Sequence, residues 1–162
     1  MSNGLVVEFF KLIGVIFSVC LGLHYYIRLG EKLSSIFKII PPDRQGWYFV
    51  VLSVLFSGGS LIFVFLREFF LKLTKIEMIS FLNRWFSLFL GILRAFIFAS
   101  FIMFLFSIPK ESYLKKSVEH SFLGRHILFI SPFIYKSTWQ SFFSKFLPLQ
   151  EFNLEIFNVE KN

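Results

Sequence analysis

The chain has a single cysteine, Cys20, which excludes an internal disulfide and a metal site built from several cysteines. Its three histidines, His24, His120 and His126, lack the spacing of metal ligands, and we expect ordinary interfacial residues. Serines are frequent, but none lies in a nucleophile-elbow motif, and the apolar segments contain no paired carboxylates. These absences argue against an enzyme, a bound metal and a cofactor.

A dense run of basic residues is also missing, although the formal net charge of the 162 residues is +7. The lysines and arginines instead flank apolar segments, which suits contact with anionic lipid headgroups better than contact with nucleic acid. We also expect no cleavable signal peptide. Glu8 comes early, and no small-x-small cleavage site follows the first apolar run.

Apolar residues dominate what remains, and they cluster. The chain is 56% hydrophobic and contains 26 phenylalanines, whereas an ordinary soluble domain is about 45–50% apolar. Runs of about twenty apolar residues are long enough to cross a hydrocarbon core as helices. The sequence therefore predicts an all-α membrane protein with about three transmembrane helices, at about 5–27, 47–66 and 85–108.

These three segments differ in quality. The second has twenty residues without a charge and begins at Trp47, the aromatic residue typical of a membrane interface. The third carries one charge, Arg94. The first has only sixteen uncharged residues between Lys11 and Arg28, which is short for a span unless its charged ends reach the interface.

Amphipathic segments surround the spans. Residues 27–40 place apolar side chains on one face, which predicts a helix lying in the membrane interface. The connector 67–83 has a similar pattern, and we expect it to prolong the second helix. From residue 110 to 162 the chain is only patchily apolar, which predicts short interfacial helices over the mouth of the bundle and a frayed end.

Small residues recur at intervals of four in the first and third spans. Residues at i and i+4 share a helix face, so each row forms a groove that another backbone can approach closely. We expect the two rows to pack against each other, the first being Gly14, Ser18 and Gly22 and the second Ser87, Gly91 and Ala95. In the second span we expect Gly58 and Gly59 to allow close packing, with a kink as the alternative.

Arg94 is the strongest candidate for a functional residue. It lies roughly 14 Å beyond Trp85 along a helix, close to mid-bilayer, and it borders the groove of small residues. A cation at that depth usually faces a bundle interior or a wet cavity. We expect it to bond with Ser53, Ser57 or backbone carbonyls, and with Glu8 only if the first helix tilts inward. A snorkelling arginine that merely fixes the helix register is the alternative.

Two further charged residues mark the membrane boundary. Glu8 lies three residues before Lys11 on one helical face, and we expect these two side chains to form a pair near the interface. Arg84 precedes the third apolar run, and we expect it to anchor the helix end at the headgroups.

A family resemblance rests on the third span. The pattern Asn83-Arg84-x-x-Ser87-x-x-x-Gly91-x-x-Arg94-Ala95 resembles the main motif of the CvpA family, the colicin V production proteins. Upstream, Gly4 and Glu8 resemble the family's Gly-x-x-x-Glu element. Ser87 and Ala95 stand where the family usually has glycine, which keeps the residues small. The resemblance covers about residues 4–140 and predicts one CvpA-like membrane domain over 1–140.

The resemblance implies a multi-pass protein of the bacterial inner membrane with no enzymatic activity. Its role would be to support colicin V-type toxin production or secretion, or envelope maintenance. The expected partners are membrane lipids and either a second copy of this chain or other membrane proteins. The alternative function is a small channel or transporter subunit in which Arg94 lines a polar path.

CvpA-like proteins resemble one another in having a spanning helix before the Gly-x-x-x-Glu element, and here Met1 lies three residues before Gly4. Two explanations follow. Either the start codon is assigned too late, or a partner helix occupies the groove formed by Gly14, Ser18 and Gly22. We favour the late start.

Overall fold

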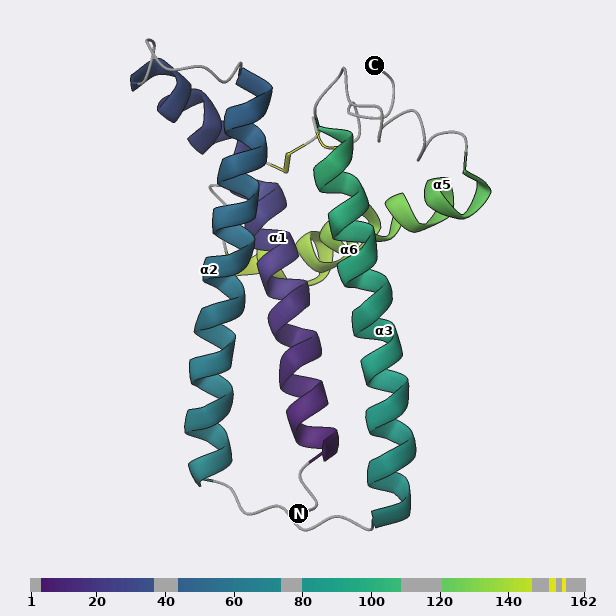
Figure 1. Ribbon diagram of the computed structural model, residues 1–162. Helices are drawn as coiled ribbons and strands as arrows, with labels where there is room; N and C mark the ends of the chain where they lie inside the picture. Colours follow the sequence, from purple (N-terminus) through teal and green to yellow (C-terminus); the bar gives the residue numbers. More distant parts are fainter. Residues whose placement is uncertain are drawn as a thin grey trace.

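Three long helices form the body of the protein. The computed structural model describes residues 4–36, 44–73, 80–108, 121–146, 152–153 and 156. The long helices are α1 (Gly4–Ile36), α2 (Arg44–Leu73) and α3 (Ser80–Ser107), shown in Figure 1. Each is long and apolar enough to cross a membrane. Every regular element among the described residues is helical, which confirms the predicted all-α membrane fold with three spanning helices.

The first helix occupies the middle of the bundle. α1 packs against both α2 and α3, whereas α2 and α3 make few contacts with each other (Figure 1). The chain runs along the bundle in alternating directions, so the start of α1, the end of α2 and the start of α3 lie at the same end of the molecule. We call this end the N-terminal end.

The helix boundaries differ from the sequence-based ones at the first span. α1 does not stop near Ile27 but continues to Ile36, so part of the amphipathic stretch belongs to the same helix. The helix continues without a break from Ile27 to Ile36, because this segment contains no proline and no residue with positive φ. Residues 37–40 lie outside the described part. α2 extends to Leu73, which confirms that the connector prolongs the second helix.

The interface between α1 and α2 uses the small residues of both helices. A Cβ added at Gly14 would lie 2.7 Å from Cβ of Phe63, and one added at Gly59 would lie 2.8 Å from Oγ of Ser18. Ser60 Oγ also donates a hydrogen bond to Ser18 Oγ over 3.3 Å. In lipid the hydrophobic effect does not drive helices together, so close van der Waals packing of this kind stabilises their association.

This arrangement corrects the expected pairing of the two small-residue rows. Gly14 and Ser18 face α2, and the added Cβ of Gly22 would lie 2.9 Å from Leu52, also on α2. Ser87, Gly91 and Ala95 therefore do not pack against that row. The prediction for the glycine pair of α2 holds at Gly59 only, because a Cβ at Gly58 would meet nothing within 4 Å.

Short helices follow the bundle. They are α5 (Phe122–Leu128), α6 (Ile130–Thr138), the π-helical turn η1 (Trp139–Phe143) and α7 (Ser144–Phe146). Ser131 N donates to Ser100 Oγ over 2.8 Å, and this hydroxyl donates to Leu128 O over 3.3 Å. These bonds hold α6 against the sides of α3 and α1, and not over the mouth of the bundle as expected (Figure 1). Most of the predicted frayed tail lies outside the described residues.

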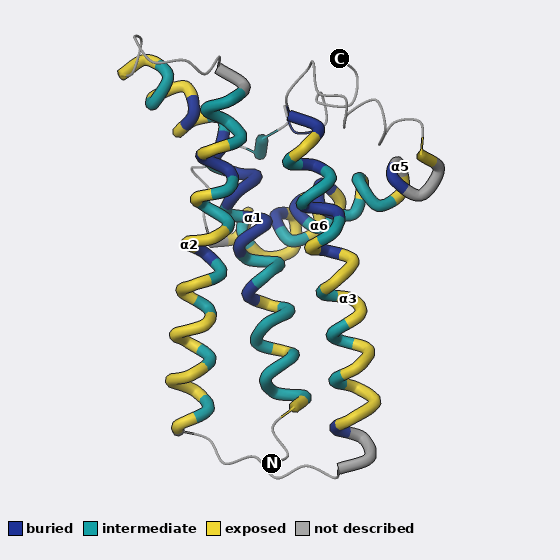
Figure 2. The backbone as a smooth tube through the Cα atoms, viewed as in Figure 1, coloured by how far each residue is buried: buried dark blue, intermediate teal, exposed yellow. Residues whose placement is uncertain are grey.

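Burial is concentrated at the level of α6. In Figure 2 the buried residues gather where α1, the upper part of α3 and α6 meet, while α2 and the lower part of α3 expose much of their length. The fully buried large side chains include Leu23 and Tyr26 of α1, Leu52 of α2, Phe104 of α3 and Tyr135 of α6. Toward the N-terminal end, exposed apolar side chains form the outer surface, which suits lipid contact.

Candidate functional site

The start of α1 is fixed to the start of α3 by a buried asparagine. The backbone N–H of Leu5 donates to Oδ1 of Asn83 over 2.6 Å. The first four N–H groups of a helix have no partner within the helix, so Asn83 serves α1 as a cap supplied from another helix. Gly4 lies close enough to Ser87 that an added Cβ would be 3.1 Å from Oγ.

One turn further along α1, this register brings two opposite charges together. Glu8 Oε2 lies 3.1 Å from Nη1 of Arg94 on α3, and Glu8 Oε1 lies 2.7 Å from Nζ of Lys11. The carboxylate thus lies between two cations, one from each helix. We call Glu8, Lys11 and Arg94 the charge cluster.

The charge cluster is partly buried. The Glu8 side chain is 19% exposed, and those of Arg94 and Lys11 are 33% and 34% exposed. Arg94 lies eleven positions after Asn83, roughly 16 Å further along α3. Within an apolar helix an unpaired arginine is costly, and a carboxylate in contact offsets much of that cost. The cluster joins α1 to α3 and leaves one positive charge in excess.

The partner of Arg94 is therefore Glu8, which the sequence favoured only for a tilted first helix. Ser53 instead donates to the carbonyl of Phe49 in its own helix, and Ser57 is exposed. The Leu5–Asn83 contact belongs to the same register of α1 against α3, in which Glu8 lies beside Arg94. The expected pair between Glu8 and Lys11 also forms.

The remaining residues of the motif surround this contact. An added Cβ at Gly91 would lie 3.9 Å from Glu8 Oε2, so the glycine leaves room for the carboxylate. Ser87 Oγ donates to the carbonyl of Asn83. Arg84 is exposed, as a boundary residue should be, and Ala95 is exposed on α3.

A second polar centre lies at the level of α6 and was missed in the sequence. His24 is buried, with Nδ1 2.9 Å from the hydroxyl of Tyr135, and its ring stacks on Trp139 with centroids 4.5 Å apart. This corrects the expectation of an ordinary interfacial histidine. The four-residue spacing from Tyr135 to Trp139 was the available signal, since it puts both rings on one helical face.

The end of the chain closes this aromatic centre. Asn153 N donates to the Tyr135 hydroxyl over 3.3 Å, and Asn153 Nδ2 donates to the carbonyl of Leu23 over 3.2 Å. Phe152 stacks on Tyr135 with centroids 5.1 Å apart. Burial raises the pKa of Tyr135 to about 12, so its hydroxyl stays protonated at neutral pH.

The described residues contain no group of three or more His, Cys, Asp or Glu side chains that could hold a metal ion. His120 lies outside that part of the chain, and His126 is exposed on α5. In the described part of the chain, the Glu8–Arg94 pair links α1 to α3. The buried contact between His24 and Tyr135 links α1 to α6.

Comparison with known proteins adds one finding. The family model described as "Colicin V production protein" matches residues 1–132, which includes all three long helices, α5 and the start of α6. No curated protein and no solved structure shows a significant match to the chain.

Proposed function

Because the chain belongs to the colicin V production protein family, we propose that it supports colicin V-type toxin production or secretion, or envelope maintenance, from the bacterial inner membrane. It does so as a non-enzymatic, multi-pass scaffold. The family is not one of known enzymes, and three helices of the chain could span a membrane.

The observation that carries the proposal is the Glu8–Arg94 contact within the matched region. A scaffold must hold its helices in one arrangement while its outer surface meets lipid or other proteins. The contact couples α1 to α3 from the inside, and it neutralises the cation of Arg94. The outer face of α3 remains apolar and exposed, for example at Trp85, Phe89 and Phe96. That face is available to lipids, a second copy or another membrane protein.

The test is genetic. Deletion of the gene in its native host, supplied with a colicin V-type toxin system, should reduce extracellular toxin or increase envelope permeability to a detergent or dye. Wild-type protein should restore the lost property, and Arg94→Ala should restore less of it at equal protein abundance. Lys32→Ala, at an exposed cation of α1 outside the motif and the charge cluster, is the control and should restore fully. Unchanged toxin and unchanged permeability after deletion would refute the proposal.

A channel or transporter subunit is the second candidate, favoured by the partial exposure of Arg94, at 33% of its side chain. In that case several copies would assemble so that the arginines line a polar path. Purified protein in lipid vesicles would then conduct ions, and Arg94→Ala would change the ion selectivity. Vesicles with no flux above protein-free vesicles would exclude this candidate and leave the scaffold.

A further inference from the structure

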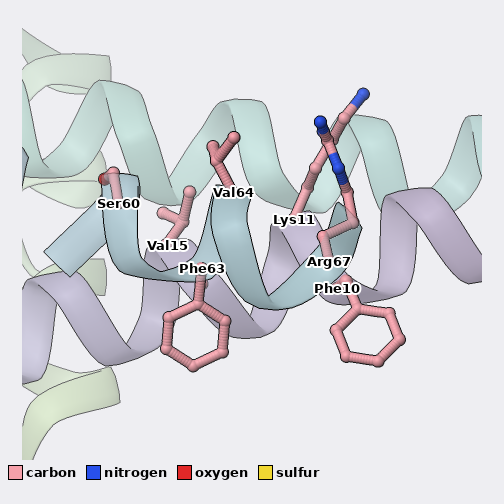
Figure 3. Close-up of a pocket in the computed structure, with 8 residues that line it drawn as sticks. Phe10, Lys11, Val15, Ser60, Phe63, Val64 and Arg67 are labelled. Carbon is pink, nitrogen blue, oxygen red and sulfur yellow. The ribbon is translucent and has the colours of Figure 1, made fainter. Parts of the chain in front are cut away.

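A narrow cleft of about 110 Å³ runs between α1 and α2 near the N-terminal end. Its walls are apolar over most of their length and include Phe10, Val15, Phe63 and Val64 (Figure 3). Gly14 forms part of the lining where the two helices come closest. The volume holds only a few methylene groups, so a longer chain bound there would continue along the outer faces of the helices.

Two cations lie at one end of this cleft. Lys11 of α1 and Arg67 of α2 both line it, and in Figure 3 their nitrogen atoms point the same way, away from Phe63. The opposite end is lined by Ser60 and Val15. The cleft is therefore amphipathic, with positive charge at one end and hydrocarbon along the rest.

Among the described residues, the neighbouring acids do not balance this charge. Glu8 contacts Lys11 but is shared with Arg94, while Arg67 Nη2 lies 3.8 Å from Glu68, whose side chain is 57% exposed. Two acids thus face three cations. The Arg67 side chain is only 22% exposed, and within the described chain its buried Nε atom has no hydrogen-bond partner. An anion at the exposed part of the guanidinium would add a charge-assisted hydrogen bond.

Both cations also stand at the edge of an uncharged apolar run. Arg67 is the first charge after the twenty uncharged residues that begin at Trp47, so it marks one edge of the apolar span. Lys11 begins the sixteen-residue uncharged run of α1 at the same end of the bundle. A headgroup phosphate at this edge would have its acyl chain directed along the apolar part of the cleft.

We propose that the α1–α2 cleft binds an anionic phospholipid of the surrounding bilayer. Lys11 and Arg67 contact the phosphate and headgroup, and the first methylene groups of one acyl chain lie against Val15, Phe63 and Val64. This lipid site requires a membrane location for the protein but not the proposed role in toxin secretion or envelope maintenance.

The test compares lipids with identical acyl chains and different headgroups. Full-length protein in a neutral detergent is titrated with phosphatidylglycerol or phosphatidylcholine, and bound lipid is counted by native mass spectrometry. Phosphatidylglycerol should bind more tightly. Arg67→Gln and Lys11→Gln should each weaken its binding about fivefold, since one basic residue near a membrane surface contributes about 1 kcal/mol. Phosphatidylcholine binding should change less.

Lys72→Gln is the matched control, because Lys72 is an exposed cation on the same helix that does not line the cleft. It should keep the wild-type preference. Equal losses in Arg67→Gln and Lys72→Gln would show general attraction to anionic lipid and overturn the site. Inorganic phosphate that competes as well as phosphatidylglycerol would also overturn a lipid site.

A second variant tests the hydrocarbon part without changing charge. Val64 is 40% exposed, so Val64→Trp should fold and fill the cleft from its open side. It should remove the preference for phosphatidylglycerol while both cations remain, and a retained preference would contradict the acyl-chain contact. If Arg67→Gln and Lys11→Gln fail to fold, Val64→Trp still tests the proposed site. A lipid preference lost without any change in toxin or envelope phenotype would separate this site from the proposed function.

Discussion

Asn83 accepts a hydrogen bond from the backbone N–H of Leu5 over 2.6 Å, although 78 residues separate the two positions. The first turn of α1 is thus capped by the first turns of α3. This contact places Leu5 at the level of Asn83, one turn before the charge cluster. In the same arrangement of the two helices, Glu8 meets Arg94.

Asn83→Ala should therefore destabilise the bundle. The variant leaves the Leu5 N–H without its acceptor, and loss of a helix cap typically costs about 1 kcal/mol. We expect a lower midpoint of thermal unfolding in detergent. Arg84→Ala, at the exposed neighbouring position, serves as the control and should change the midpoint little. Equal midpoints for the two variants would contradict a capping role.

The Glu8–Arg94 pair should show energetic coupling. Removing one member of a fully buried pair costs about 3–5 kcal/mol, and partial exposure here lowers the expected cost to about 1–2 kcal/mol. Glu8→Gln and Arg94→Gln should each reduce the free energy of unfolding by that amount. The double variant should lose less than the sum of the two. Additive losses in this double-mutant cycle would show that the two side chains do not interact.

The adjacent glycines of α2 should respond in opposite directions to alanine. Gly58→Ala has open space around its new Cβ and gains helix propensity, so it should stabilise the protein by about 0.5–1 kcal/mol. Gly59→Ala would place its Cβ 2.8 Å from Ser18 Oγ and should destabilise by about 1–3 kcal/mol. Thermal unfolding of the two variants measures both effects. Similar shifts in one direction would mean that α1 does not approach α2 at Gly59.

Tyr135 should make stability depend on alkaline pH. Its pKa is raised by burial to about 12, above the value of about 10 for an exposed tyrosine. The folded state then holds the proton more tightly than the unfolded state. The resulting stability is fully present below about pH 10 and is lost as the pH rises toward 12.

Tyr135→Phe provides the comparison. The variant should be less stable than wild type near pH 8, because the hydroxyl contacts His24 and Asn153. The difference in unfolding midpoint between the two proteins should shrink as the pH is raised from 9 to 11.5. A constant difference over this range would mean that Tyr135 does not titrate differently in the folded state.

The number and position of the long helices could be predicted from the sequence because each is marked by a run of uncharged apolar residues. The extension of α2 to Leu73 followed from the same patterning. Helix partners were harder, because two helices offered small residues to α1. Gly59 and Ser60 of α2 receive Ser18, whereas the row on α3 was the expected partner.

The candidate site likewise contains one residue that could be predicted from the sequence and contacts that could not. Arg94 could be recognised from the sequence, since a charge within an apolar run must find a partner. That its partner is Glu8 depends on where α1 begins relative to Asn83, which local patterns do not specify. The contact between His24 and Tyr135 joins residues 111 positions apart and depends on how α6 crosses the bundle.

The central position of α1 has a consequence for synthesis. Glu8 leaves the ribosome 86 residues before Arg94, an interval on the order of 4–17 s at about 5–20 residues per second. α1 can thus acquire its α2 contacts before α3 is made, but Glu8 cannot meet Arg94 until α3 has been translated and inserted. Until then, of the two cations that Glu8 contacts in the folded protein, only Lys11 on its own helix has been made.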